Sequence, residues 1–410
     1  KFRDAKVDGL FVPHCNFGTE YEVCRLAKKL NVPVLLWGPR DECPDENGMR
    51  LRDSQCGLFA TGKVLRRFGI PFTYLKNCNL EDECFAEGID RFLRVCNVVK
   101  AFRNTRVLQI STRPFDFWST MCNEGELLEK FGIQLSPIPM PELTQAMKDV
   151  KENSPEEIKE VTDYCREKMC IKVTPEQLDN VAALKIAMTR LGKKYGCNCG
   201  AIQCWNALQD EIGIMPCAAN ALCNDEGFPI ACETDIHGTI TSVLVEAAAM
   251  GETRSFFADW TVRHPYNDNA ELLQHCGPWP ISIAKEKPTI DTPVAFDCSG
   301  SLMAQAKDGE HISLVRFDGD NGEYSLLLGN AKTVDGPYTK GTYMWVEVEN
   351  LDRLEDKLVQ GPYIHHCVGV HQDVVPVLYE ACKYIGVTPD LYDPIEEKVK
   401  AIIRGEKVEK

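Results

Sequence analysis

Residues 231–238, with the sequence ACETDIHG, bring two acidic side chains and a His-Gly pair to the end of an apolar segment. A strand is predicted before this run, and a helix over residues 239–250 after it. In α/β folds ligands bind at the carboxyl ends of strands, where carboxylates can bind metal ions or transfer protons. The alternative is that Asp235 or Thr234 caps the helix while Glu233 is solvated.

A second group lies in residues 361–367, GPYIHHC, where two histidines are adjacent. Neighbouring side chains of an extended chain point to opposite faces, so only one of His365 and His366 is expected to face a given site. One histidine would then bind a metal ion and the other a substrate, with His371 and Asp373 orienting the ligand. The alternative is a structural pair in a loop.

The third group combines Gln203 and Trp205 with the acidic pair Asp210 and Glu211. An aromatic ring beside polar groups suits a sugar, because the ring can stack on C–H faces while the polar atoms bond to hydroxyls. The alternative is an amphipathic helix with a core tryptophan and solvated acids.

Alternating strand-like and amphipathic segments predict the elements that position these groups. The order strand, helix, strand of a βαβ unit is predicted for residues 9–12, 21–30 and 32–37, and a similar unit begins at residues 106–110. Two helices are expected in the middle of the chain. The first begins at a predicted capping box, SPEE at residues 154–157, and the second at TPE.

After about residue 285 the pattern changes to short β-rich segments separated by turns that contain Gly and Asp, which predicts a mostly antiparallel terminal unit. The segments are residues 293–298, 312–317, 324–328 and 342–349, followed by a last helix near 374–385. We therefore expect an α/β fold divided into residues 1–105, 106–226 and 227–410, the last with the β-rich part and metal ligands. Because residue 1 lies close to the first strand, the first domain is treated as truncated at its start.

The composition excludes some classes of protein. A formal net charge of −15 disfavours nucleic acid, whose binding needs clustered Lys and Arg. No apolar stretch reaches the roughly 18 residues of a membrane helix. The 20 cysteines are scattered without a CxxC spacing, which favours reduced thiols in the cytoplasm over a disulfide framework. Motifs for nucleotide binding and for serine or zinc hydrolysis are missing.

Taken together, segments from most of the chain resemble the L-fucose/L-arabinose isomerase superfamily, and in particular L-fucose isomerase-like proteins. The segments that carry the resemblance are residues 202–205, 232–235, 258–259, 273–277 and 361–366, with earlier ones at 16–20, 52–57 and 123–128. The resemblance implies two Rossmann-like (flavodoxin-like) α/β domains followed by a β-rich C-terminal domain, in agreement with the periodicity.

In that family a Glu, an Asp and a His bind one Mn²⁺-like ion, and the carboxylates act as acid and base. Carried over by position, the resemblance implies Asp235 and His366 as ligands, with Glu211 as the third and Asp210 or Glu233 as its alternatives. Glu211 and Asp235 are then the implied catalytic pair. The implied substrate contacts are Gln203, Trp205, His275 and His365.

The expected function is therefore a metal-dependent aldose–ketose isomerase acting on a small sugar, such as L-fucose, D-arabinose or L-arabinose, by enediol proton transfer. The metal would be Mn²⁺ or another divalent ion such as Mg²⁺ or Co²⁺. The family implies a homo-oligomer, commonly a hexamer, and the scattered cysteines favour a cytoplasmic location. One alternative is an isomerase of a sulfonated or phosphorylated hexose, with Arg52, Arg113 and Arg263 as sources of a basic pocket. Another is a non-catalytic sugar-binding protein.

Overall fold

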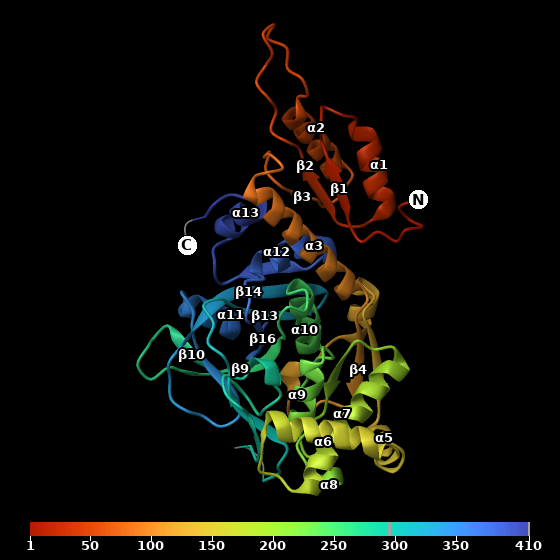
Figure 1. Ribbon diagram of the computed structural model, residues 1–410, viewed down its shortest axis with the longest axis vertical. Coiled ribbons are helices and arrows are strands. Elements are labelled where there is room, and N and C mark those ends of the chain that lie inside the picture. The colour runs from red at the N-terminus through yellow and green to blue at the C-terminus, as the bar shows by residue number, and fades with distance from the viewer. Residues whose placement is uncertain (294–296, 409–410) are drawn as a thin grey trace. The chain divides into compact units, whose positions relative to one another are not determined.

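The computed structural model describes residues 1–293 and 297–408 and divides into two compact units (Figure 1). The first unit contains residues 1–101, 374–388 and 394–410, and the second contains residues 102–373 and 389–393. The chain therefore leaves the first unit after its first quarter and returns to it near its C-terminal end.

The first unit is built on a parallel sheet with the strand order β1-β2-β3. Its strands are β1 (Leu10–Pro13), β2 (Val34–Trp37) and β3 (Thr73–Tyr74), and its first helices are α1 (Glu20–Leu30), α2 (Ser54–Arg67) and α3 (Glu83–Arg103). Alternate side chains of β2 lie on opposite faces of the sheet. Val34 and Leu36 pack with α1 and α2, whereas Leu35 and Trp37 pack with Phe92 of α3. The predicted βαβ unit is confirmed.

Two helices from the end of the chain complete the first unit, α12 (Val375–Ile385) and α13 (Glu396–Arg404). The Thr73 hydroxyl lies 2.6 Å from Glu380 Oε1, and the Lys76 amide donates to the Arg404 carbonyl over 3.1 Å. These contacts explain why helices expected in the domain 227–410 lie with the first 101 residues. The division at residues 105 and 226 itself stays a prediction.

The second unit contains a four-stranded parallel sheet with the order β5-β4-β7-β8. Its strands are β4 (Arg106–Ile110), β5 (Gln134–Ile138), β7 (Cys199–Ile202) and β8 (Ile230–Ala231). The helices between and after them are η1 (Trp118–Thr120), α4 (Glu124–Glu126), η2 (Leu127–Phe131), α5 (Met140–Asn153), α6 (Pro155–Lys168), α7 (Pro175–Tyr195), α8 (Ala207–Ile212), α9 (Cys217–Asp225) and, after β8, α10 (Ile236–Ala248). Helix α7 buries its apolar face, which includes Leu178, Val181, Leu184 and Met188.

The same unit contains a mixed sheet with the order β17-β14-β13-β16-β9-β10-β15-β12-β11-β6. Its strands are β6 (Cys170–Ile171), β9 (Phe256–Arg263), β10 (Ala270–His275), β11 (Thr289–Asp291), β12 (Ser301–Gln305), β13 (Ile312–Asp320), β14 (Glu323–Val334), β15 (Thr342–Glu347), β16 (His366–Val370) and β17 (Thr388–Leu391), with the helices η3 (Ile281–Ile283) and α11 (Leu351–Gln360). A further pairing of β14 with β15 closes six of these strands into a ring. Closure removes free edges from that part of the sheet.

The α/β class and the strand-rich terminal part are confirmed, and most pairings in that part are antiparallel. The strand predicted at residues 293–298 falls largely outside the described residues. The prediction of a capping box at Ser154 is wrong, because no side-chain cap forms there and Ser154 Oγ accepts a hydrogen bond from Arg190 instead. The capping box of this region lies at Thr174 and Gln177. In the described ranges, no helix combines the length and apolar character needed to cross a bilayer.

Replacement of Thr174 by alanine should lower the free energy of unfolding by about 1 kcal/mol, because the Gln177 amide loses its bond to Thr174 Oγ1. Ser154→Ala is the matched control, since its hydroxyl does not cap a helix, and should cost less than about 0.5 kcal/mol. Urea unfolding measures both values. Equal losses for the two variants would contradict this assignment of the cap.

Candidate metal centre

Three parallel strands of the second unit are followed by residues with left-handed backbone. Ser111 follows β4 with φ 65°, Asn206 follows β7 with φ 65°, and Glu233 and Thr234 follow β8 with φ 52° and 51°. Non-glycine residues rarely adopt this conformation, β-branched ones least of all, and such residues concentrate at functional sites. The Thr234 amide holds the last turn by donating to the Ile202 carbonyl over 3.0 Å.

The turn after β8 places Glu233 against side chains of the mixed sheet. Glu233 Oε2 lies 3.4 Å from His275 Nε2 and 4.0 Å from His366 Nε2. Asp259 Oδ1 lies 3.8 Å and 3.5 Å from the same two nitrogens. Neighbouring strands account for this convergence, because Asp259 of β9 is in register with His366 of β16 and with Gln274 of β10. Four potential ligand atoms therefore meet in one place.

The donor set fits a divalent cation. Among the described residues, Glu233 Oε2 and Asp259 Oδ1 are buried without a hydrogen-bond partner, which is costly for a carboxylate unless a cation compensates it. Carboxylate and imidazole ligands suit Mn²⁺, Zn²⁺ and related ions. Such ions, bound at about 2.1 Å, hold neighbouring ligand atoms roughly 3.0–3.4 Å apart. Small rotations of these side chains would bring them to that spacing.

Electrostatic interactions within the group are strong. Burial disfavours the ionised form of Glu233, but His275 lowers the pKa of this carboxyl below its ordinary value. Burial also disfavours the charged form of His275, yet Asp259 and Glu233 raise its pKa to about 9. The imidazolium thus compensates the carboxylates when no metal is bound. Because a metal ligand must be the neutral imidazole, metal binding by His275 would release a proton.

A buried ion-pair network contacts the Nδ1 side of the His366 ring. Arg316 of β13 makes two bonds to Asp235 and a third, of 2.9 Å, from its Nε to Asp318 Oδ2. Asp235 Oδ2 also lies 2.8 Å from His366 Nδ1, and its Oδ1 accepts the Gly238 amide over 2.9 Å. Burial opposes ionisation of Asp235, but the Arg316 guanidinium holds its pKa far below the ordinary range. The bond to Nδ1 fixes the ring so that Nε2 faces the other ligands.

Aromatic rings form one wall of the site. The Phe117 ring stacks on His366 with centroids 5.5 Å apart and meets the Trp205 ring edge-on at 5.2 Å. The His365 ring lies 5.7 Å from Phe117 and 4.5 Å from His366. Apolar ring faces beside imidazole nitrogens can contact the C–H faces and the hydroxyls of a sugar.

The structure brings together only part of the predicted ligand set. His366 lies in the group, but Glu211 is exposed on α8, whose buried residue is Leu208, and in the described chain Glu211 joins no cluster of potential ligands. Glu233, its alternative, occupies the expected place. Asp235 lies behind His366 with both oxygens bonded. The geometry therefore favours Glu233 and Asp259 over Glu211 and Asp235, and Asp210 is exposed as well.

The predicted substrate contacts lie around the same group. His275 is one of its four members, and Gln203 accepts the Ser111 hydroxyl over 2.7 Å at the ends of β4 and β7. The expectation that adjacent histidines diverge is wrong, because His365 and His366 both approach Asp259. His365 lies in a bend before β16 begins, so strand alternation does not apply to it.

Three residues of the site had no predicted role. Asp259 is a polar residue inside a buried strand, and Arg316 is a lone cation in the run ISLVRF; both are patterns that could have signalled buried ionic contacts. Phe117 lies in an irregular loop, and no local pattern marks it. Its carbonyl accepts the Thr120 hydroxyl over 3.1 Å, and that hydroxyl also lies 3.4 Å from the Glu233 carbonyl.

Comparisons with known proteins point to one class of enzyme. Residues 1–103 match the family model described as fucose/sulfoquinovose isomerase, N-terminal domain. The chain is 24% identical over 394 residues to a sulfoquinovose isomerase of Priestia aryabhattai, covering 94% of this chain and 86% of the relative. It is 24% identical over 357 residues to one of Alkalicoccus urumqiensis, covering 86% of this chain and 79% of the relative.

These similarities confirm the predicted resemblance to the L-fucose isomerase-like superfamily and the class of enzyme, an aldose–ketose isomerase. Within that class, the relatives that match over most of the chain are named for the isomerisation of sulfoquinovose. The homo-oligomeric state and the cytoplasmic location stay predictions.

Replacement of Asp235 by asparagine should affect both metal binding and stability. The variant keeps an acceptor for the Gly238 amide but removes the charge that pairs with Arg316, so unfolding should become easier by about 3–5 kcal/mol. Loss of the anionic partner of His366 should weaken Mn²⁺ binding about 10- to 100-fold. Urea unfolding and metal titration measure the two effects. Wild-type Mn²⁺ affinity in this variant would contradict the orienting role.

Proposed function

We propose that this chain interconverts the aldose and ketose forms of a sulfonated hexose, with a divalent ion held by Glu233, Asp259 and His366. The observation that carries the proposal is the pair of buried, unbonded carboxylate oxygens facing two imidazole nitrogens. The names of the relatives support the substrate class. They do not support L-fucose or an arabinose, which the sequence favoured.

The proposed ion is Mn²⁺, with Mg²⁺ and Co²⁺ as chemically similar alternatives. When bound, it would polarise the sugar carbonyl oxygen and stabilise the negative charge that develops on the enediolate. His275 completes the ligand group. The set leaves room for sugar oxygens, since four protein ligands do not fill the coordination shell of a six-coordinate ion.

The reaction moves one proton between C2 and C1 and another between O2 and O1. Glu233 and Asp259 are the carboxylates placed for these transfers: one removes the C2 proton of the aldose and returns it at C1, and the other carries the hydroxyl proton. Asp235 is unsuited to either role, because Arg316, His366 and a backbone amide engage both its oxygens. Asp235 is therefore a positioning residue.

The remaining predicted contacts orient the open-chain sugar. Phe117 and Trp205 offer ring faces and edges to C–H groups, while Gln203 and His365 offer polar atoms to hydroxyls. These four side chains come from the ends of β4, β7 and β16, which also carry the loops that surround the ligand group. Contacts with these four side chains would hold C1 and C2 of the sugar near both carboxylates.

The exchange of Glu233 for glutamine should abolish Mn²⁺-dependent ketose formation, with a loss of at least about 10²-fold. Glu211→Gln is the matched control, an exposed acid on α8 that should keep wild-type turnover. The assay follows conversion of sulfoquinovose by EDTA-stripped protein resupplied with Mn²⁺ or buffer. If the Glu211→Gln variant were inactive and the Glu233→Gln variant active, Glu211 would be the catalytic glutamate. Turnover that does not require metal would refute the proposal.

Recognition of a sulfonate needs a cation, and the neighbouring cavity does not supply one. This cavity, of about 710 Å³, is lined by residues beside Phe117 and His365, among them the acids Glu124, Asp318 and Asp320. Arg263, a predicted source of a basic pocket, is paired with acids of α11, Glu355 being one.

Arg113 is the better candidate for the sulfonate. It follows Thr112, whose carbonyl accepts the Thr234 hydroxyl over 3.0 Å, so its loop is fastened to the turn that carries Glu233. The Arg113 guanidinium bonds to the carbonyls of Pro114 and Phe115 in its own loop. The described contacts of Arg113 include no carboxylate, and its neighbour Thr112 holds the turn that carries Glu233, so this arginine suits an anionic group of the substrate.

Accordingly, Arg113→Gln should raise KM for sulfoquinovose at least about tenfold, with a smaller change in kcat, because a charged hydrogen bond is worth about 1.5–3 kcal/mol. The control is Arg263→Gln, whose cation is already paired with acids, and its KM should stay unchanged. A neutral hexose should show the same kinetics with each protein. Equal KM values for Arg113→Gln and wild type would remove Arg113 from substrate recognition.

A further inference from the structure

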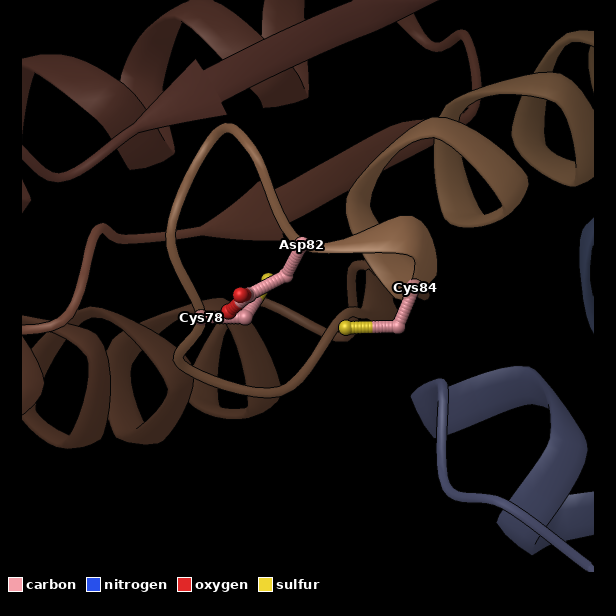
Figure 2. A group of neighbouring side chains, drawn as sticks. All are labelled: Cys78, Asp82 and Cys84. Carbon is pink, nitrogen blue, oxygen red and sulfur yellow. The ribbon is translucent and has the colours of Figure 1, made fainter.

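A second cluster of metal-ligating side chains lies in the first unit, outside the site described above. It consists of Cys78, Asp82 and Cys84, whose ligand atoms all lie within 4.8 Å of one another (Figure 2). The other such clusters of the described residues share Glu233 or Asp259 with the candidate metal centre. Cys78, Asp82 and Cys84 occupy one short loop between β3 and the first turn of α3.

We propose that Cys78, Asp82 and Cys84 form a binding site for a thiophilic divalent cation such as Zn²⁺. Two thiolates and one carboxylate are ligands that Zn²⁺ prefers, and a water molecule can fill the fourth tetrahedral position when the protein supplies three. Zn–S bonds of about 2.3 Å hold two sulfurs roughly 3.8 Å apart. Atoms already within 4.8 Å need little movement to reach that spacing.

The loop holds each ligand in place without metal. Asp82 Oδ2 accepts the Asn79 amide over 2.8 Å, which fixes the carboxylate and leaves Oδ1 for a cation. Asn77 anchors the start of the loop by donating to the carbonyls of Gly38 and Pro39. In Figure 2 the Asp82 oxygens lie beside the Cys78 side chain, and the Cys84 sulfur points toward the space next to them.

The two sulfur atoms have surroundings that suit metal ligands. The Trp37 indole N–H donates to Cys78 Sγ over 3.2 Å, and N–H bonds to sulfur are a common support of metal thiolates. Cys84 is the second residue of α3, so its position is fixed by the start of that helix. Leu35, Leu75 and neighbouring apolar side chains cover the cluster from the core.

The cluster has a reason to take up a cation. A bound Zn²⁺ would supply the positive charge that offsets two thiolates and one carboxylate gathered in one loop. The site needs no residue of the candidate metal centre, so it stands apart from the proposed isomerase function.

The test uses the full-length protein, reduced and stripped of metal with a chelator, and titrated with Co²⁺ as a spectroscopic probe for Zn²⁺. Thiolate-to-cobalt charge-transfer absorption should appear as Co²⁺ is added, reach a plateau by two equivalents because the candidate metal centre can also take up Co²⁺, and disappear when Zn²⁺ is added. Cys204 and Cys232 lie beside Glu233 and could also give such a band, so the variants described next decide where it arises. This readout does not involve turnover, so a failure here is distinguishable from a failure of the isomerase assignment.

Substitutions test whether the charge-transfer band arises from Cys78, Asp82 and Cys84. Cys84→Ser and Asp82→Asn should each weaken Co²⁺ binding at this site at least tenfold. Asp82→Asn keeps an acceptor for the Asn79 amide, so it tests the charge without removing the bond that fixes the loop. The matched control is Cys43→Ser with Cys56→Ser, two exposed cysteines of the same unit, and should leave the titration unchanged.

Absence of a charge-transfer band in the wild-type protein would overturn the proposal. So would a band that keeps its amplitude and affinity in both Cys84→Ser and Asp82→Asn, or one that is lost in the control pair. Circular dichroism on each variant confirms that the fold is intact, and Zn²⁺ should raise Tm for the wild type more than for Asp82→Asn.

Discussion

The ion pair between Arg316 and Asp235 is the interaction on which the candidate metal centre depends. Both side chains are about 1% exposed, so neither charge can turn to water if the other is lost. Through Asp235 the pair fixes the His366 ring and caps α10, and through Arg316 it is tied to β13. One buried contact thus joins the parallel sheet's last helix to the strand-rich sheet that carries the other ligands.

The site combines several features that oppose stability. Two consecutive left-handed residues, Glu233 and Thr234, are strained, and Glu233 Oε2 and Asp259 Oδ1 are buried without hydrogen-bond partners. Each such feature costs on the order of 1–3 kcal/mol in a typical protein. Their concentration where two sheets meet is the pattern of a functional site, since the surrounding fold stabilises a geometry that its local sequence disfavours.

The sequence predicted the α/β class and the strand-rich part, but its preferred metal ligands include only one of the three proposed here, His366, for reasons visible in single residues. Strands such as β4 have a local apolar period, so their bounds could be read directly. His366 was found by its position in a resemblance. Asp259 was not, because only the register of β9 with β16 brings it to His366. Glu211 was preferred to Glu233 although exposure on α8, a tertiary property, separates it from the group.

The closed ring of strands has a consequence for how the protein folds during synthesis. Strand β16 sits between β13 and β9 in the ring, yet it is the last of the six to be synthesised. Pairings between segments far apart in sequence form slowly, because the intervening chain must be ordered first. The nascent chain therefore carries Asp235 and Asp259 for more than a hundred residues before His366 emerges. Until then an incomplete ring exposes strand edges, the state in which a protein of this kind most needs protection from aggregation.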